Sequence, residues 1–190
     1  MPNVTIIGTG NMGQAIAGVL TKGGAAVDLI GHQDDGDVSG EVVVLAVPYP
    51  ALADVVSKRG DQLNGKVVVD ISNPLNVETF DSLRVPPDSS AAAELAERLP
   101  GAKVLKAFNT NFAATLASGT LGGEPTTVLI AGDDADAKAD LAALVTAGGL
   151  RAIDAGSLRR ARELEALGFL QITLAAAERI PWTGGFAVQS

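Results

Sequence analysis

Val4-Thr5-Ile6-Ile7-Gly8-Thr9-Gly10-Asn11-Met12-Gly13 is the stretch that decides the fold of this chain. An apolar strand signal runs directly into glycines spaced as G-x-G-x-x-G, and residues 11–20 continue with helical spacing. Gly8 permits a tight turn, Gly10 lets a ligand approach the backbone closely, and Gly13 lets the helix pack on the sheet. Such a turn presents amide groups to a pyrophosphate. The stretch therefore predicts dinucleotide binding; the alternative is a turn with a structural role only.

Composition limits the class of protein. The chain has 190 residues, 47% of them hydrophobic, which is enough for one domain with a full core. A net charge of −8 and 4% aromatic residues argue against a nucleic-acid partner. With no cysteine and one histidine, disulfides, thiol catalysis and a metal site are not expected. The longest apolar run, 42–47, is too short to span a bilayer and no secretory signal precedes the first strand, so we expect a cytoplasmic protein without membrane contacts.

Strand and helix signals alternate along the whole chain. The alternation predicts a doubly wound, mostly parallel α/β sheet with helices on both faces, in a single domain over residues 1–190. The expected strands are 4–7, 26–30, 42–47, 66–70, 102–107, 126–131 and 150–154. The expected helices are 12–21, 49–57, 90–99, 111–117, 135–146 and 158–179, with N-terminal signals at Ser90 and Asp134.

One connection is unusually short. Only residues 31–41, rich in Asp and Gly, separate the second and third expected strands. A parallel crossover needs about a dozen residues and usually contains a helix. We therefore expect the second crossover helix to be shortened or absent.

The end of the second strand indicates which nucleotide is bound. NAD enzymes place an acidic residue there for the ribose hydroxyls. Asp28 lies within the expected strand, and the strand ends at Gly31 with no carboxylate at its tip. His32 and Gln33 follow, and both can donate hydrogen bonds to a 2′-phosphate. These residues predict NADP; the alternative is that His32 is an exposed loop residue without a ligand.

Three further strand ends carry short polar groups beside rigid turns. Ligands of open α/β sheets bind at the carboxyl ends of the strands. These positions therefore predict contacts to the nicotinamide ribose and carboxamide, although ordinary Asx and proline turns would look the same. The segments are Ala46-Val47-Pro48-Tyr49, Asn73-Pro74 and Asn109-Thr110-Asn111.

Four segments together point to a known family. They are Gly8-Thr9-Gly10-Asn11-Met12-Gly13, Ala46-Val47-Pro48, Val69-Asp70-Ile71-Ser72-Asn73-Pro74-Leu75 and Val104-Leu105-Lys106-Ala107-Phe108-Asn109-Thr110. Over essentially the full chain they closely resemble the NADP oxidoreductases that use the deazaflavin coenzyme F420. The tail 182–188 is similar to a compact bacterial subgroup of dinucleotide-binding oxidoreductases.

The resemblance implies a Rossmann-type fold and hydride transfer between NADP(H) and F420 or a flavin-like acceptor such as FMN. It also implies that contacts to nicotinamide map onto Asn109 to Ala113, with Asn109, Thr110, Asn111 and Ala113 as the candidate site residues. In the family, a Ser or Thr followed by Arg grips the 2′-phosphate at the places taken here by His32 and Gln33.

The remaining residues leave the acceptor site open. Hydride transfer between two ring cofactors needs positioning more than acid–base groups, so we assign no catalytic residue. Lys106 contacts the acceptor or forms a structural ion pair. The C-terminal tail offers two alternatives. It lines one side of a flat acceptor ring through Trp182, Gly184, Gly185 and Phe186, or its aromatic residues anchor the C-terminus.

The last long helix offers two further alternatives. Arg159, Arg160 and Arg162 bind an anionic ligand tail, or they pair with Glu163 and Glu165. This C-terminal helix completes the acceptor site or forms a homodimer interface through the stripe Leu164, Leu167, Leu170 and Leu174.

The leading functional reading is an NADP(H)-dependent oxidoreductase. One alternative is a module that binds or senses NADP(H) without turnover. The other is a reductase of a small metabolite, which the lack of an acid–base pair weakens.

Overall fold

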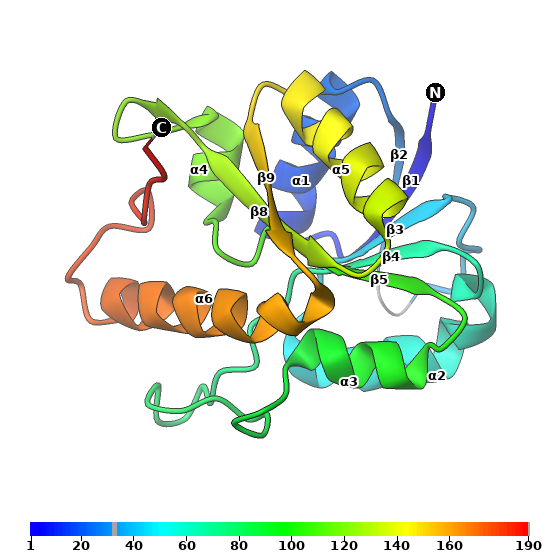
Figure 1. Ribbon diagram of the computed structural model, residues 1–190, viewed down its shortest axis with the longest axis horizontal. Coiled ribbons are helices and arrows are strands. Elements are labelled where there is room, and N and C mark those ends of the chain that lie inside the picture. The colour runs from blue at the N-terminus through cyan, green and yellow to red at the C-terminus, as the bar shows by residue number, and fades with distance from the viewer. Residues whose placement is uncertain (32–33, 190) are drawn as a thin grey trace.

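Strands and helices alternate along the described residues, 1–31 and 34–189, of the computed structural model (Figure 1). The strands are β1 (Asn3–Ile7), β2 (Ala26–Ile30), β3 (Val42–Leu45), β4 (Val67–Asp70), β5 (Lys103–Lys106), β6 (Thr120–Leu121), β7 (Glu124–Pro125), β8 (Thr127–Gly132) and β9 (Arg151–Gly156). The α-helices are α1 (Asn11–Lys22), α2 (Leu52–Leu63), α3 (Ala91–Arg98), α4 (Ala113–Ser118), α5 (Ala135–Ala147) and α6 (Ala161–Ala176). Short 3-10 turns, η1 (Tyr49–Ala51) and η2 (Leu158–Arg160), precede α2 and α6.

One seven-stranded sheet organises the molecule, with strand order β2-β1-β3-β4-β5-β8-β9. The five strands from β2 to β5 are parallel, β8 runs antiparallel to β5, and β9 is parallel to β8. The order reverses between β1 and β3, because the chain adds β2 on one side of β1 and all later strands on the other. The prediction of a doubly wound, mostly parallel α/β sheet is confirmed.

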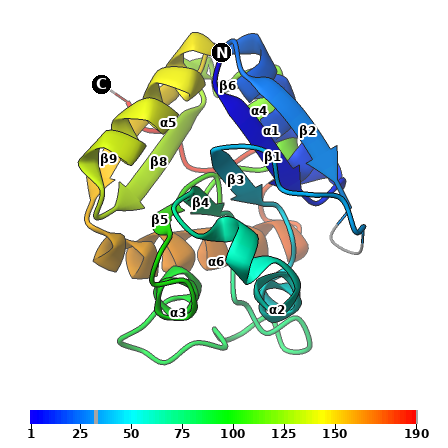
Figure 2. The same cartoon turned by 90° about the vertical axis from the view of Figure 1, so that its right-hand side faces the viewer.

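Helices cover both faces of the sheet, so the molecule has three layers (Figures 1 and 2). On one face, side chains such as Ile16 of α1, Leu116 of α4 and Leu141 of α5 pack in one buried cluster with the sheet. On the other face, Val55 of α2 and Leu95 of α3 belong to a second cluster. Continuously apolar strands supply both clusters, as expected for strands buried on two faces.

The connection between β2 and β3 contains no helix in its described part, as its length predicted. Side chains of α2 hold the loop instead. The Arg59 guanidinium, buried within the fold, donates to the carbonyl groups of Asp34 and Gly36. The Val38 amide donates to Gln62 Oε1 at 2.7 Å.

The element boundaries differ from expectation mainly at helix ends. The Ser90 and Asp134 side chains cap α3 and α5 as predicted, accepting from the amides of Ala93 and Ala137. The last helix begins with η2 and ends at Ala176, because Glu178 adopts a left-handed conformation with φ 58°. The hairpin β6–β7 was not expected, since its strands are only two residues long. Among the described residues, no helix is both long and apolar enough to cross a bilayer.

A buried ion network links the sheet to two helices on one face. Lys106 Nζ on β5 lies 2.7 Å from Asp70 Oδ2 on β4 and 2.8 Å from Glu165 Oε1 on α6, and all three side chains are fully buried. It also donates to the Ser72 carbonyl at 2.6 Å. Glu165 Oε2 accepts from the Ala91 amide at 2.9 Å, at the start of α3. Burial raises the pKa of the Glu165 carboxyl above its usual range, and the nearby Lys106 opposes that rise.

Because of this network, we expect removal of the Lys106 charge to destabilise the fold strongly. Lys106→Met leaves Asp70 and Glu165 facing each other in the interior, so we expect a loss of about 3–5 kcal/mol in the free energy of unfolding. Urea denaturation followed by circular dichroism measures it. The matched control is Lys103→Met on the same strand, whose half-exposed side chain pairs with Asp134 at the surface. Equal losses in the two variants would contradict the role given to Lys106.

Candidate functional site

The predicted site residues converge at one edge of the sheet. The register pairs Ile7 with Leu45, Leu45 with Asp70, and Asp70 with Lys106, so β1, β3, β4 and β5 end at the same level. The reversal of strand order between β1 and β3 lies within this edge. Open α/β sheets bind ligands at such a reversal, outside the carboxyl ends of the strands.

The turn between β1 and α1 needs two of its glycines for packing. Gly8 has φ +123°, and a Cβ there would lie 2.1 Å from the Ala46 carbonyl oxygen at the end of β3. A Cβ on Gly13 would lie 2.1 Å from the Gly8 carbonyl oxygen. A Cβ on Gly10 would meet nothing within 4 Å. The first and third glycines therefore close the turn, while the second borders open space.

The start of α1 is open to a ligand. Its N-cap residue, Gly10, supplies no side-chain hydrogen bond, and the first turn has no acidic residue. Thr9, Gly10 and Asn11 are exposed and Met12 is partly so. The first amides of a helix have no intrahelical partner and carry partial positive charge. This open helix start fits the diphosphate of a dinucleotide.

The end of β2 corrects one expectation. His32 and Gln33, predicted to contact a 2′-phosphate, lie outside the described residues. The expectation that no carboxylate lies at this strand end was wrong, because the Gly31 amide donates to Asp34 Oδ2 at 2.7 Å. The Asp34 amide in turn donates to the Gly31 carbonyl at 3.1 Å, so the acidic residue lies at the strand tip.

The end of β3 divides into two parts. The Ala46 amide donates to the Ile7 carbonyl at 2.8 Å, which places Ala46 against the glycine turn, with Val47 buried and Pro48 exposed next to it. Tyr49 lies in η1, and its hydroxyl donates to Glu94 Oε2 on α3 at 2.8 Å.

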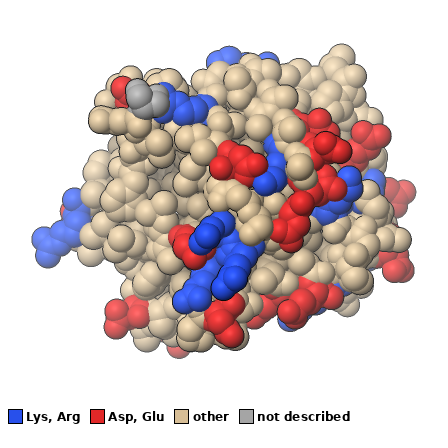
Figure 3. Space-filling model, viewed as in Figure 1, with Lys and Arg blue, Asp and Glu red and all other residues tan. Residues whose placement is uncertain are grey.

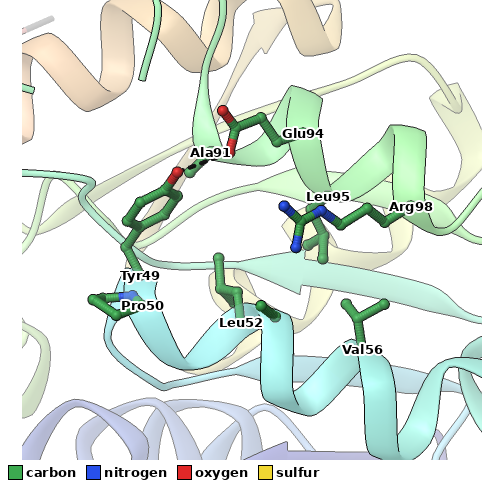
Figure 4. Close-up of a pocket in the computed structure, with 9 residues that line it drawn as sticks. Tyr49, Pro50, Leu52, Val56, Ala91, Glu94, Leu95 and Arg98 are labelled. Atoms are coloured by element: carbon green, nitrogen blue, oxygen red, sulfur yellow. Dashed lines mark hydrogen bonds between the residues drawn. The ribbon is translucent and has the colours of Figure 1, made fainter. Parts of the chain in front are cut away.

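Tyr49 borders a small cavity of about 150 Å³ between α2 and α3 (Figure 4). Desolvation, together with the hydrogen bond to Glu94, raises the pKa of Tyr49 to about 12. The sequence placed Tyr49 with the other strand-end residues; its hydroxyl instead joins two helices on one face.

A larger cavity, of about 460 Å³, lies between the start of α1 and the ends of β4 and β5. It is lined by Asn11, Met12, Ile71, Asn73, Asn109, Asn111, Phe112, Ala113, Ala114, Ile172 and Trp182. Six of these residues were predicted as contacts. Pro74 and Thr110 do not line it; both are buried, and the Thr110 carbonyl accepts from Gln171 on α6 at 3.2 Å.

Sequence reasoning missed three apolar residues of this lining, namely Ile71, Ala114 and Ile172. Ile71 lies two residues before the selected Asn73 and Ala114 directly follows the selected Ala113, so nearness to selected residues was the available signal. Ile172 of α6 had no such signal, because only the packing of α6 brings it to the cavity.

Two asparagines form a reciprocal pair at the base of the cavity. Asn73 Nδ2 donates to the Asn109 carbonyl, and Asn109 Nδ2 donates to Asn73 Oδ1, both at 2.9 Å. Asn109 Nδ2 also donates to the Leu164 carbonyl at 2.8 Å. α6 approaches so closely that a Cβ on Gly168 would lie 2.4 Å from Asn73 Oδ1. The pair thus joins β4, β5 and α6 while it lines the cavity.

No residue that lines this described cavity is ionisable. Lys106, which the sequence left between an acceptor contact and a structural ion pair, belongs to the buried network with Asp70 and Glu165. The site can therefore orient and desolvate a ring, but these side chains supply it with no acid or base.

Basic side chains gather over the start of α6 (Figure 3). Arg159, Arg160 and Arg162 are exposed, and Arg160 lies 3.4 Å from Glu163. The suggested pairing with Glu165 was wrong, because Glu165 lies on the buried face of α6. Helix phase also breaks the leucine stripe: Leu164 is buried, whereas Leu170 is 48% exposed.

The sheet, its reversal point and the open glycine turn define a Rossmann-type dinucleotide-binding protein. Comparison with known proteins narrows this class. A family model described as NADP oxidoreductase, coenzyme F420-dependent, matches residues 27–74. The chain is 32% identical over 173 residues to the F420-dependent NADP reductase of Methanocaldococcus jannaschii, covering 87% of this chain and 76% of that protein.

The chain belongs to this family of F420-dependent NADP oxidoreductases, as its sequence segments indicated. It is also 33% identical over 183 residues to the metalloreductase STEAP3 of Rattus norvegicus, spanning 36% of that protein. A crystal structure from Arthrobacter sp. FB24, of a protein described as a candidate F420-dependent NADP reductase, matches with TM-score 0.83 and 26% identity. That match covers 100% of both chains.

The glycine geometry predicts that two substitutions lower the free energy of unfolding by very different amounts. Gly8→Ala adds a Cβ against a backbone oxygen in a left-handed conformation, so we expect the free energy of unfolding to fall by at least about 2 kcal/mol. Gly10→Ala enters open space and should cost at most about 1 kcal/mol as a poorer N-cap. Urea denaturation measures both. A loss in Gly10→Ala as large as in Gly8→Ala would contradict the assigned geometry.

Proposed function

We propose that this protein transfers a hydride between NADP(H) and a deazaflavin, F420, or a flavin-like acceptor such as FMN. The observation that carries the proposal is the open start of α1, which leads into a cavity lined by amides and apolar groups without an ionisable side chain. In the reducing direction, the dihydronicotinamide is oxidised by loss of a hydride, and a proton from solvent completes reduction of the acceptor ring.

We propose that the nucleotide lies along the carboxyl ends of the strands. The diphosphate lies on the amides of residues 8–13, with Gly10 leaving room for it. The adenosine side lies toward the end of β2, where His32 and Gln33 remain proposed contacts. Ala46, Val47, Pro48 and Tyr49 remain proposed contacts at the end of β3.

The nicotinamide end is proposed to lie in the cavity between α1, β4 and β5. Asn73 and Pro74 follow β4, and Asn109, Thr110, Asn111 and Ala113 follow β5. Of these, Asn73, Asn109, Asn111 and Ala113 line the cavity, while Pro74 and Thr110 are buried and do not line it. A carboxamide needs hydrogen-bonding partners of this neutral kind.

The chemistry suits a site without acids or bases. Hydride transfer between two rings depends on holding them face to face at a near-attack distance, and the cofactors carry the reaction. This argument disfavours reduction of a small metabolite whose carbonyl or imine needs a proton donor.

The test is an assay of NADPH oxidation at 340 nm with purified protein. We expect turnover with F420 or FMN as acceptor, and none with NADPH alone. Gly10→Val is the matched variant: it should abolish nucleotide binding and turnover while circular dichroism stays unchanged, because its side chain fills the phosphate space. Tight NADPH binding without turnover on any acceptor would instead favour a sensor. Unchanged affinity in Gly10→Val would refute the phosphate seat.

Asp34 is expected to weaken discrimination in favour of NADPH. Its carboxylate lies at the strand tip where a 2′-phosphate approaches. Asp34→Asn should therefore strengthen NADPH binding by about 1 kcal/mol, the Coulomb energy of two unit charges about 4 Å apart in water. NADH, which lacks the phosphate, should gain nothing. Fluorescence titration of both nucleotides measures this, with Asp37→Asn as control, and an equal gain for NADH would contradict it.

The assembly and compartment complete the proposal. We propose a homodimer that uses the outer face of α6, where Leu170 is exposed and Leu167 and Leu174 are half-buried. Sedimentation velocity of wild type and Leu170→Lys tests this. The single domain acts in the cytoplasm, where pyridine nucleotides are held, and α6 helps to complete its acceptor site.

A further inference from the structure

Trp182 is the only tryptophan of the chain, and it lines the cavity beside the start of α1. It comes from the tail that follows α6, shortly after Ile172 and far along the sequence from the other cavity residues. The side chain is 53% exposed, although indole is among the most apolar surfaces a protein can bury. A large aromatic face is thus presented at the mouth of the cavity.

The indole is held in place by its surroundings. Its ring centroid lies 5.0 Å from that of Phe112, with the planes tilted by 55°. The Gly184 amide donates to the Pro181 carbonyl at 2.8 Å and closes a turn around Trp182. Trp182 is therefore a fixed element of the cavity rather than a loose end.

The tail around this turn is tied to the body at two further places. Gln171, buried in α6, donates to the Thr110 carbonyl and accepts from the Phe186 amide at 3.1 Å. Arg151 Nη1 on β9 donates to the Val188 carbonyl at 2.8 Å. Figure 1 shows the tail running from the end of α6 toward α4. These ties keep the indole over the cavity.

The cavity is lined by two kinds of side chain. Asn11, Asn73, Asn109 and Asn111 supply amides from α1 and the strand ends. Phe112, Ile172 and Trp182 supply apolar and aromatic surface from the α4 side, α6 and the tail. Under the proposed function the amides bind the nicotinamide, which leaves the apolar and aromatic groups for the ring that exchanges the hydride.

We propose that Trp182 is the outer wall of the acceptor site and packs against the face of the acceptor ring, which selects planar aromatic acceptors of the flavin or deazaflavin class. This inference rests on the proposed function. Offset stacking of two aromatic rings adds to the burial of their area, so the indole stabilises a flat tricyclic ring more than a small aliphatic substrate.

Three variants separate this role from a structural one. Trp182→Leu should raise the dissociation constant and KM of the acceptor about tenfold or more, while the NADPH dissociation constant stays within about twofold. Trp182→Phe keeps a smaller aromatic face and should recover part of the loss. Phe186→Leu is the control, because this other exposed aromatic of the tail does not line the cavity. Its acceptor affinity should match that of wild type.

The readouts are calorimetric titration with FMN and with F420, and quenching of the single tryptophan by the same compounds. Saturable quenching in wild type and in Phe186→Leu supports the inference. Acceptor affinity unchanged in Trp182→Leu, or lost equally in Phe186→Leu, overturns it, and so does the absence of acceptor binding to wild type. Absence of NADPH oxidation with every acceptor would instead refute the proposed function, because calorimetry decides the role of Trp182 without turnover.

Discussion

The buried ammonium group of Lys106 is the contact on which the ligand-facing edge depends. It bridges carboxylates from β4 and α6, and it holds the Ser72 carbonyl directly before Asn73. Glu165, the far end of this network, also receives the first amides of α3. Three charges without water are costly unless each finds opposite charge and hydrogen bonds, so this network fixes the positions of its elements tightly.

The same network positions the two asparagines that line the cavity. Lys106 and Asn109 are three residues apart at the end of β5, and Ser72 and Asn73 are adjacent after β4. Fixing Lys106 against Ser72 therefore places the two asparagines within reach of one another, and α6 seals them through Gly168. Lys106, Asp70 and Glu165 pair with one another in the interior, and no residue that lines the described cavity is ionisable. A neutral, amide-lined cavity beside an open helix start suits a dinucleotide that brings its own charge.

An acidic protein with a net charge of −8 has to bind an anionic cofactor by local means. The partial positive charge at the start of α1 acts over the first turn only, and no acidic residue of that turn opposes it. The loop after β2 works in the other direction, since the Asp34 carboxylate lies at the strand tip. NAD and NADP share the diphosphate and differ only in the 2′-phosphate, so Asp34 bears on the choice between them and the start of α1 does not.

The sequence by itself determined the alternation of strands and helices, the glycine turn, the missing helix after β2 and the family. These features depend on residues close together in the chain: the apolar runs, the spacing of Gly8, Gly10 and Gly13, and the short length of 31–41. Only the tertiary structure decided the rest. The Asp34 carboxylate lies at the strand tip, the Tyr49 hydroxyl donates to Glu94, Glu165 is buried, and Ile172 and Trp182 line the cavity. Each of these depends on helix phase or on packing between distant segments, and a linear pattern of residue types does not encode which distant partner a side chain meets.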